Sequence, residues 1–255
     1  MQTKRNLTDS RNLLRKALRS NTQRRMNPNC IGRRLSILTL CIAIACFVLP
    51  SAAQTYRLDL VLLFDVSANM AGQLKIIKEG ASPAASELSE GDRVAVMSYA
   101  KTAKIISSFT DDATQIEEAI QKVNAPLFKN SDLQCLNDAL FEAIRQFPQK
   151  SEPDRKLAIG IITNNADVGS AHQNAELIKA AKARNIAVWV FLVDSPKQNS
   201  SQRQSANRGN TYSNVQNAKQ QLGFIAEEIG GGAMAVEANG YVLQKAIAVC
   251  KGITR

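Results

Sequence analysis

The pattern of apolar and polar positions divides most of this chain into strands and helices. Three runs have almost no polar alternation, which is typical of strands buried on both faces of a parallel sheet: 58–64, 156–163 and 186–193. Residues 93–100 predict a further strand, and 104–109 can return beside it as an antiparallel edge strand. Apolar residues at helical spacing predict helices within 71–90 (interrupted near Gly80 and Pro83), 111–123, 131–147, 175–183, 222–229 and 241–250.

The order of these elements predicts the fold class. Strands that alternate with helices form a mostly parallel sheet covered on both faces, and a short last strand after Gly230, Gly231 and Gly232 completes it. We therefore predict a single doubly wound α/β domain over 54–255 with one antiparallel edge strand. The stretch from 194 to 217 is rich in Ser, Asn and Gln, and it predicts a mobile polar surface insertion, either a solvated spacer or a partner-binding loop.

A polar cluster follows the first buried strand directly. Asp65, Ser67 and Asn69 carry oxygen-bearing side chains two residues apart. In an open α/β sheet, ligands bind beyond the carboxyl ends of the strands, so this cluster is a candidate binding site. Its simplest alternative role is to cap the helix that begins near Ala71.

Four segments of the sequence resemble the von Willebrand factor A domain family. They are the strand with its Asp-x-Ser-x-polar-Met loop at 58–70, GDRVAVMSYA at 91–100, CLNDALFEA at 135–143 and IAEEIGGGAMAVE at 225–237. The resemblance covers about 58–252. It implies a Rossmann-like fold, a protein-recognition role without catalysis, and a metal-ion-dependent adhesion site formed by three loops at the top of the sheet.

Carried over by position, that resemblance places five residues in the three loops. The first loop supplies Asp65, Ser67 and Asn69, the second supplies Gln134 where the family has Thr, and the third supplies Asn164 where the family has Asp. Only Asp65 and Ser67 match the family's metal ligands, and Asp65 is the one carboxylate of the five. Because Mg²⁺ favours compact, charged oxygen ligands, we expect no cofactor, with Mg or Mn as the alternative if the degenerate site still binds, helped by Asp132.

The formal charge of +10 does not indicate nucleic-acid binding, because it lies outside the predicted domain. Residues 1–53 carry ten of the 32 basic residues and one of the 22 acidic ones. Arg33 and Arg34, the apolar run 35–49 and the small residues 51–53 form the pattern of a secretory signal cleaved after Ala53. The chain is therefore expected in the periplasm or outside the cell. In the alternative, the apolar run stays uncleaved and anchors the chain to a membrane. Translation can start at Met1 or at Met26, and the sequence leaves this open.

The chain's cysteines and its one histidine leave two further questions open. Export would allow Cys135 and Cys250 to pair, although two cysteines do not define a disulfide framework. One histidine and no CxxC motif argue against a zinc site. A hydrolase that uses Ser67 and His172 is the enzymatic alternative, but Ser67 lacks the Gly-x-Ser-x-Gly turn of a hydrolase nucleophile.

The sequence thus predicts an exported, non-enzymatic module that recognises another protein through the face around Asp65, Ser67, Asn69, Gln134 and Asn164. The main alternative is a metal-dependent domain that captures an acidic side chain of its partner. Neither the partner nor the oligomeric state follows from the sequence.

Overall fold

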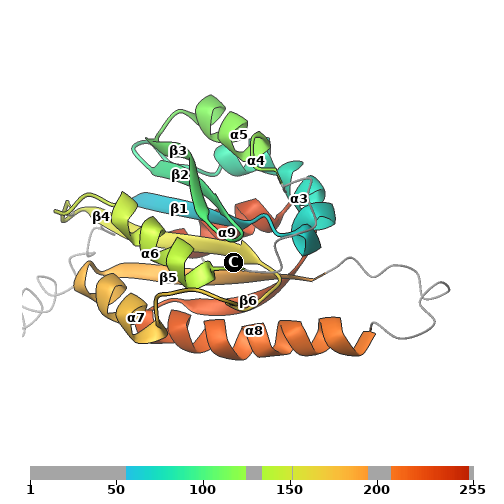
Figure 1. The fold of residues 1–255 in the computed structure, drawn as a ribbon. Helices are drawn as coiled ribbons and strands as arrows, with labels where there is room; N and C mark the ends of the chain where they lie inside the picture. Colours follow the sequence, from blue (N-terminus) through green and yellow to red (C-terminus); the bar gives the residue numbers. More distant parts are fainter. Residues whose placement is uncertain (1–55, 125–133, 151, 195–207, 253–255) are drawn as a thin grey trace, which may run out of the picture. The chain divides into compact units, whose positions relative to one another are not determined.

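Six strands form one sheet in the order β3-β2-β1-β4-β5-β6 (Figure 1). The structure is a computed structural model that describes residues 56–124, 134–150, 152–194 and 208–252, with the backbone alone for 208–218. The strands are β1 (Arg57–Asp65), β2 (Arg93–Tyr99), β3 (Ala103–Thr110), β4 (Arg155–Thr163), β5 (Ile186–Asp194) and β6 (Gly232–Glu237). All neighbours pair in parallel except β2 and β3, which pair antiparallel. The predicted fold class is confirmed.

Helices cover both faces of this sheet (Figure 1). They are η1 (Ala68–Met70), α3 (Ala71–Lys78), α4 (Ala81–Ala85), α5 (Ala113–Gln121), α6 (Leu136–Gln146), α7 (Asn174–Ala183), α8 (Arg208–Ile229) and α9 (Val242–Lys251). One apolar cluster joins α3, α4, α5 and α9 to one face, and a second joins α6, α7 and α8 to the other. Successive side chains of a strand point to opposite faces, so β1 contributes Leu60 and Leu62 to the first cluster and Val61 and Leu63 to the second.

Strand β1 lies between β2 and β4, and every residue after Arg57 in it is buried. Near its start, the fully buried Asp59 accepts hydrogen bonds from Arg93 at 2.9 and 2.6 Å and from Arg155 at 2.8 Å. These ion pairs hold the N-terminal ends of β1, β2 and β4 together, which satisfies a carboxylate that would be costly to bury alone. The opposite, carboxyl end of β1 leads into the candidate site.

Glycines shape the turn from α8 into β6. Gly230 has a φ of +98°, which other residues rarely adopt. A Cβ on Gly231 would lie 1.7 Å from the carbonyl oxygen of Val188, so only glycine lets β6 approach β5 there. Gly230 and Gly231 therefore form a tight turn between α8 and β6.

Two predictions differ from the observed structure. Helix α8 begins at Arg208, inside the predicted insertion; because a helix propagates cooperatively from a packed segment, its buried C-terminal part extends into the polar stretch. Residues 195–207 of that insertion lie outside the described residues. Helix α4 ends at Ala85 rather than near 90.

Cys135 and Cys250, whose pairing the sequence left open, do not pair, since both thiols are free and buried. Cys250 packs in the α9 cluster, whereas Cys135 precedes α6 on the other face of the sheet. Within the described residues, no helix combines the length and the apolar character needed to cross a bilayer.

Candidate functional site

Asp65 occupies the carboxyl end of the central strand and joins two loops. Its Oδ1 accepts the backbone N–H of Ser67 at 2.8 Å, and its Oδ2 accepts the hydroxyl of Thr163, the last residue of β4, at 2.7 Å. The Asp65 side chain is fully buried. Burial raises the pKa of Asp65, while the hydrogen bonds from Ser67 and Thr163 act in the opposite direction without cancelling it.

The side chains of Ser67 and Asn164 hold the two unpartnered oxygens of this site. Ser67 is 1% exposed, and its Oγ makes no hydrogen bond within the described residues, although it lies near enough to Asp65 to lower that pKa slightly. The Oδ1 atom of Asn164 is also buried without a donor, while its Nδ2 donates to the backbone oxygen of Asn69 at 3.3 Å. Four of the five predicted residues, Asp65, Ser67, Asn69 and Asn164, thus come together.

Gln134, the fifth predicted residue, is buried in the loop that enters α6. Its backbone exchanges two hydrogen bonds with Val168, at 3.2 and 2.9 Å, and the N–H of Cys135 donates to Ala100 at 2.9 Å. Within the described residues, no hydrogen bond links Gln134 to the four residues around Asp65. Asp132, which was expected to help a metal bind, lies outside the described residues.

These residues do not fit a tightly bound divalent cation. Mg²⁺ and Mn²⁺ favour several charged oxygen ligands, and Asp65 is the one carboxylate in the set. Both of its oxygens already accept hydrogen bonds from the protein. Among the described residues, no group of three or more His, Cys, Asp or Glu side chains could hold a metal. What the site retains is oxygen donors without the charge that a divalent ion needs.

His172 contacts Asp138 rather than Ser67, so the nucleophile and base of the hydrolase alternative do not meet. The Nδ1 atom of His172 lies 2.7 Å from Oδ1 of Asp138, and its ring stacks on Phe141 with centroids 4.2 Å apart. Among the described residues, no basic side chain makes a hydrogen bond to the Ser67 hydroxyl. Without a base in contact, this serine lacks the activation that a nucleophile requires.

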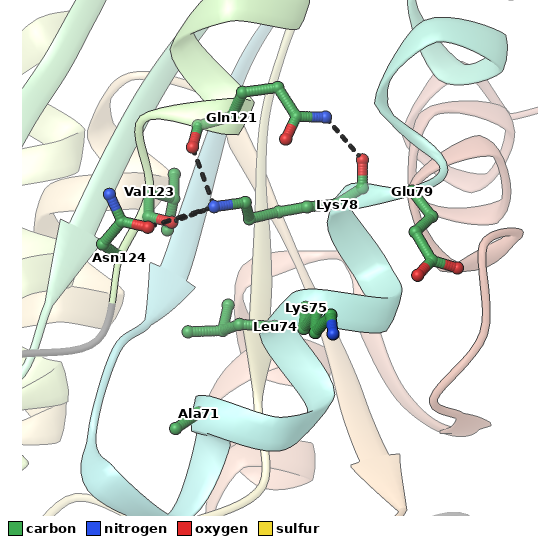
Figure 2. Close-up of a pocket in the computed structure, with 8 residues that line it drawn as sticks. All are labelled: Ala71, Leu74, Lys75, Lys78, Glu79, Gln121, Val123 and Asn124. Atoms are coloured by element: carbon green, nitrogen blue, oxygen red, sulfur yellow. Dashed lines mark hydrogen bonds between the residues drawn. The ribbon is translucent and has the colours of Figure 1, made fainter.

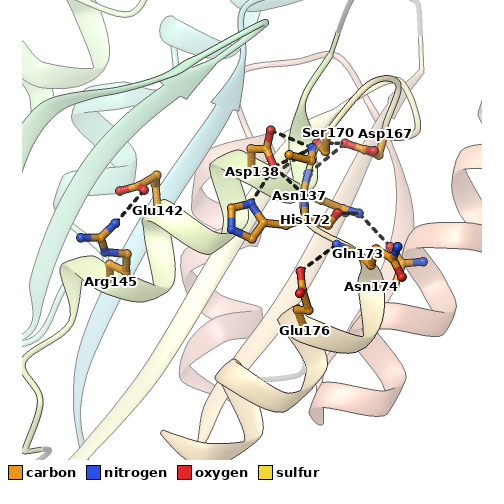
Figure 3. Close-up of polar contacts among 11 residues, drawn as sticks. Asn137, Asp138, Glu142, Arg145, Asp167, Ser170, His172, Gln173, Asn174 and Glu176 are labelled. Carbon is orange, nitrogen blue, oxygen red and sulfur yellow. Dashed lines mark hydrogen bonds and ion pairs between the residues drawn. The ribbon is translucent and has the colours of Figure 1, made fainter.

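A reciprocal set of caps instead joins the start of α6 to the loop before α7 (Figure 3). Asp167 accepts the N–H of Asn137 at 2.9 Å, and the hydroxyl of Ser170 accepts the N–H of Asp138 at 3.2 Å. In return, Asp138 accepts the N–H groups of Ala171 and His172 at 3.0 and 2.9 Å. These caps hold the second and third loops of the candidate site together.

The titration of Asp138 reflects this contact. Burial alone would raise the pKa of the Asp138 carboxyl. The hydrogen bonds from the backbone and side chain of His172, and from the backbone of Ala171, outweigh that effect, so the pKa lies below its ordinary value. The ionised form of Asp138 is therefore stabilised in the folded protein.

A surface pocket of about 360 Å³ lies between α3 and the end of α5 (Figure 2). The ammonium group of Lys78 crosses it and donates to the backbone oxygens of Gln121 and Val123, each at 2.8 Å, and to Oδ1 of Asn124 at 3.1 Å. Desolvation lowers the pKa of Lys78. Because the last carbonyls of a helix need donors, Lys78 caps the end of α5, and the pocket has a structural explanation.

The fold and its polar cluster define a class: doubly wound α/β domains with polar loops gathered at the carboxyl end of the central strands. A family model gives a more specific assignment. The model of the von Willebrand factor type A domain matches residues 59–228, and the chain belongs to this family. Proteins of the family are generally interaction modules. The comparison with curated proteins gave no match.

Solved structures show the same fold at low sequence identity. BatB, a conserved hypothetical protein from Bacteroides thetaiotaomicron, is 22% identical with a TM-score of 0.57, over 76% of this chain and 97% of that one. A second similar structure is an aerotolerance-related membrane protein from Bacteroides fragilis NCTC 9343 that carries multiple mutations to serines. It is 19% identical with a TM-score of 0.58, and the match covers 77% of this chain and 100% of that chain.

A third similar structure is proximal thread matrix protein 1 from the mussel byssus, with a zinc-occupied MIDAS motif. It is 13% identical with a TM-score of 0.55, and the match covers 78% of this chain and 48% of that chain. At these identities the three likenesses show the fold alone.

Proposed function

We propose that this chain is an exported, non-enzymatic protein-recognition domain that binds its partner without metal. Its recognition surface is the top face, formed by Asp65, Ser67, Asn69, Gln134 and Asn164. The observation that carries the proposal is the pair of unpartnered oxygens beside a buried carboxylate, at the sheet edge where α/β domains bind ligands. Buried polar groups without partners are rare in folded proteins and need an explanation. A partner that supplies donors explains them.

Export rests on the N-terminal sequence and on one relative. Residues 33–53 have the basic, apolar and small-residue pattern of a secretory signal. The similar protein from Bacteroides fragilis is a membrane protein, which supports a role in the cell envelope. We place the mature domain in the periplasm or outside the cell, and the alternative is an uncleaved segment that anchors it to a membrane.

Surface crosslinking tests the recognition face. A photoreactive amino acid replaces the exposed Asn69, or replaces Glu87, which lies in the turn after α4 away from the three loops. Chains exposed to the envelope fraction of their source cell should crosslink one protein from position 69 and none from position 87. Equal crosslinking from both positions would refute a recognition role for the top face.

A metal-dependent domain is the second candidate, because Ser67 Oγ and Asn164 Oδ1 are oxygens that a cation could also contact. Thermal unfolding separates the two. A ligand that binds only the folded state must raise the melting temperature. We expect equal melting temperatures in EDTA and in millimolar Mg²⁺ or Mn²⁺. A metal-dependent rise that is absent in Asp65→Ala would establish the second candidate instead.

A further inference from the structure

Within the described residues, the top face has two buried oxygens without hydrogen-bond partners and no positive charge that balances Asp65. Asp65 makes no ion pair within the described residues, and each of its oxygens accepts only a neutral donor. Ser67 Oγ and Asn164 Oδ1 are buried and have no donor. Each such group costs free energy when it is left without a partner. A ligand that brings both donors and a positive charge would relieve all three.

A partner's carboxylate does not suit this set of atoms. In the absence of a divalent ion, an acidic side chain would face the Asp65 carboxylate and the Asn164 carbonyl, which repel it. A primary ammonium group fits, since it carries three donors and one positive charge. The site offers one oxygen for each of those donors, from Asp65, Ser67 and Asn164.

We propose that the top face binds a lysine side chain of the partner protein, with Asp65 as counter-ion and Ser67 and Asn164 as hydrogen-bond acceptors. This assignment rests on the proposed function and reverses the charge of the group that an occupied metal site would capture. A lysine suits the site better than an arginine, because a slender four-carbon stem carries its ammonium group, whereas the guanidinium is a planar fork.

In this proposal the lysine enters between Asn69 and Asn164, the two exposed or partly exposed residues beside the buried oxygens. Asn69 is exposed and Asn164 is partly exposed. One hydrogen bond of 3.3 Å, at the long end of the range, ties the Asn164 amide to the Asn69 backbone. Rotation of that amide costs one weak bond and brings Asn164 Oδ1 to the incoming ammonium group.

Capped tripeptides test the assignment on the full 255-residue chain. Acetyl-Gly-Lys-Gly-amide is titrated while NMR follows the side-chain amide of Asn164, and the same peptide with norleucine or glutamate in place of lysine is the matched probe. We expect a saturable shift from the lysine peptide alone. Ser67→Ala should weaken its binding about tenfold, whereas Ser86→Ala, at an exposed serine after α4, should leave it unchanged.

Three results would overturn the assignment: no saturable shift with lysine, an equal shift with norleucine, or unchanged affinity in a folded Ser67→Ala variant. A shift that requires the glutamate peptide together with Mg²⁺ would replace lysine capture with metal-dependent capture. The crosslinking result at position 69 is independent of these titrations. If crosslinking persists and the lysine peptide fails, the recognition face stands and only the lysine is wrong.

Discussion

Asp65 is the residue at which stability and binding oppose each other. Its carboxylate is fully buried, makes no ion pair in the described part of the chain, and has a raised pKa because burial outweighs its hydrogen bonds. A protein with no use for that charge would be more stable with a neutral amide of the same shape. Its presence fits a site whose positive partner arrives from another molecule.

We therefore expect Asp65→Asn to raise the free energy of unfolding at pH 7 by about 1–3 kcal/mol while it abolishes binding of the lysine peptide. The amide can still accept the N–H of Ser67 through its oxygen and can donate to Thr163. Urea unfolding measures the first effect and the NMR titration the second. A destabilised variant would show that Asp65 already has its charge compensated within the fold.

Asn164 stands where the von Willebrand factor A family has a metal-binding Asp. Asn164→Asp would place a second carboxylate beside Asp65 and supply the charge that a divalent ion needs. The melting temperature of this variant should rise with Mn²⁺. At a free Mn²⁺ concentration 100 times the dissociation constant, binding adds about 2.7 kcal/mol to the free energy of unfolding. Asn165→Asp, one residue further along the same loop, is the matched control and should show no rise. If Mn²⁺ leaves the melting temperature of Asn164→Asp unchanged, the loops cannot place their oxygen ligands in an octahedral arrangement.

The sequence located most of this site but missed the residues that hold it. Asp65, Ser67 and Asn69 were predicted because they follow the end of a buried strand, and Asn164 was predicted from the resemblance to the von Willebrand factor A family. Thr163 was missed, since it ends an apolar run and reads as part of the strand. Its hydroxyl becomes a donor to Asp65 only when β1 and β4 lie side by side, a relation that spans 98 residues of sequence.

At the scale of elements, the reciprocal caps between α6 and the loop before α7 organise the second and third loops (Figure 3). Cys135 precedes α6 and offers no side-chain cap. The orphan N–H groups at the start of the helix are satisfied from another loop, by Asp167 and Ser170. A local capping motif was therefore absent from the sequence, and the contact could not be predicted from spacing.

Asp138→Ala should lower the free energy of unfolding by about 1–3 kcal/mol, because it leaves the N–H groups of Ala171 and His172 without their acceptor. Glu142→Ala, one turn later on α6, removes an exposed ion pair with Arg145 and should cost almost nothing. The folded pKa of Asp138 is lowered. Its contribution is thus complete above the ordinary value of 3.8 and disappears as the pH falls through the lowered value.

Urea unfolding of both variants at pH 7 and at pH 3 measures this contribution. The difference in the free energy of unfolding between wild type and Asp138→Ala should be smaller at pH 3 than at pH 7. A constant gap would assign the loss to packing of the side chain rather than to its charge.

Gly231 sets the spacing between two further elements, β5 and β6. Because a Cβ there would lie 1.7 Å from the Val188 oxygen, Gly231→Ala should destabilise the domain by about 3 kcal/mol or more. Gly223→Ala, within α8, places its Cβ 3.9 Å from Ala233 and should be neutral or stabilising by up to about 1 kcal/mol. The melting temperatures of the two variants measure these effects. Equal decreases in melting temperature would contradict the close approach of Gly231 to the Val188 carbonyl.

Across the whole molecule, the strand and helix order was predictable because the central strands are short continuous apolar runs, whereas the helices bury apolar residues at a period of about 3.6. The main error concerns residues 208–217, whose polar composition predicted an insertion without regular structure, whereas the chain there is helical. A polar stretch with little to bury became the first turns of α8, because the packed residues Leu222, Ile225 and Ile229 fix the helix from its other end. Single-residue composition carries no record of that cooperativity.

The distribution of charge over the whole chain gives the last prediction. Ten of the 32 basic residues lie within 1–53, and the remainder of the chain is almost neutral, so we assign the basic segment to the proposed leader rather than to the recognition face. When the full chain is produced in a bacterium with an export pathway, the envelope fraction should contain a protein whose measured mass is that of a chain beginning at Gln54. Ala53→Arg should block this cleavage, because the processing site requires a small residue, and should leave the longer chain attached to the membrane. An intact 255-residue chain in the wild-type sample, held in the membrane fraction, would instead identify residues 35–49 as a permanent anchor.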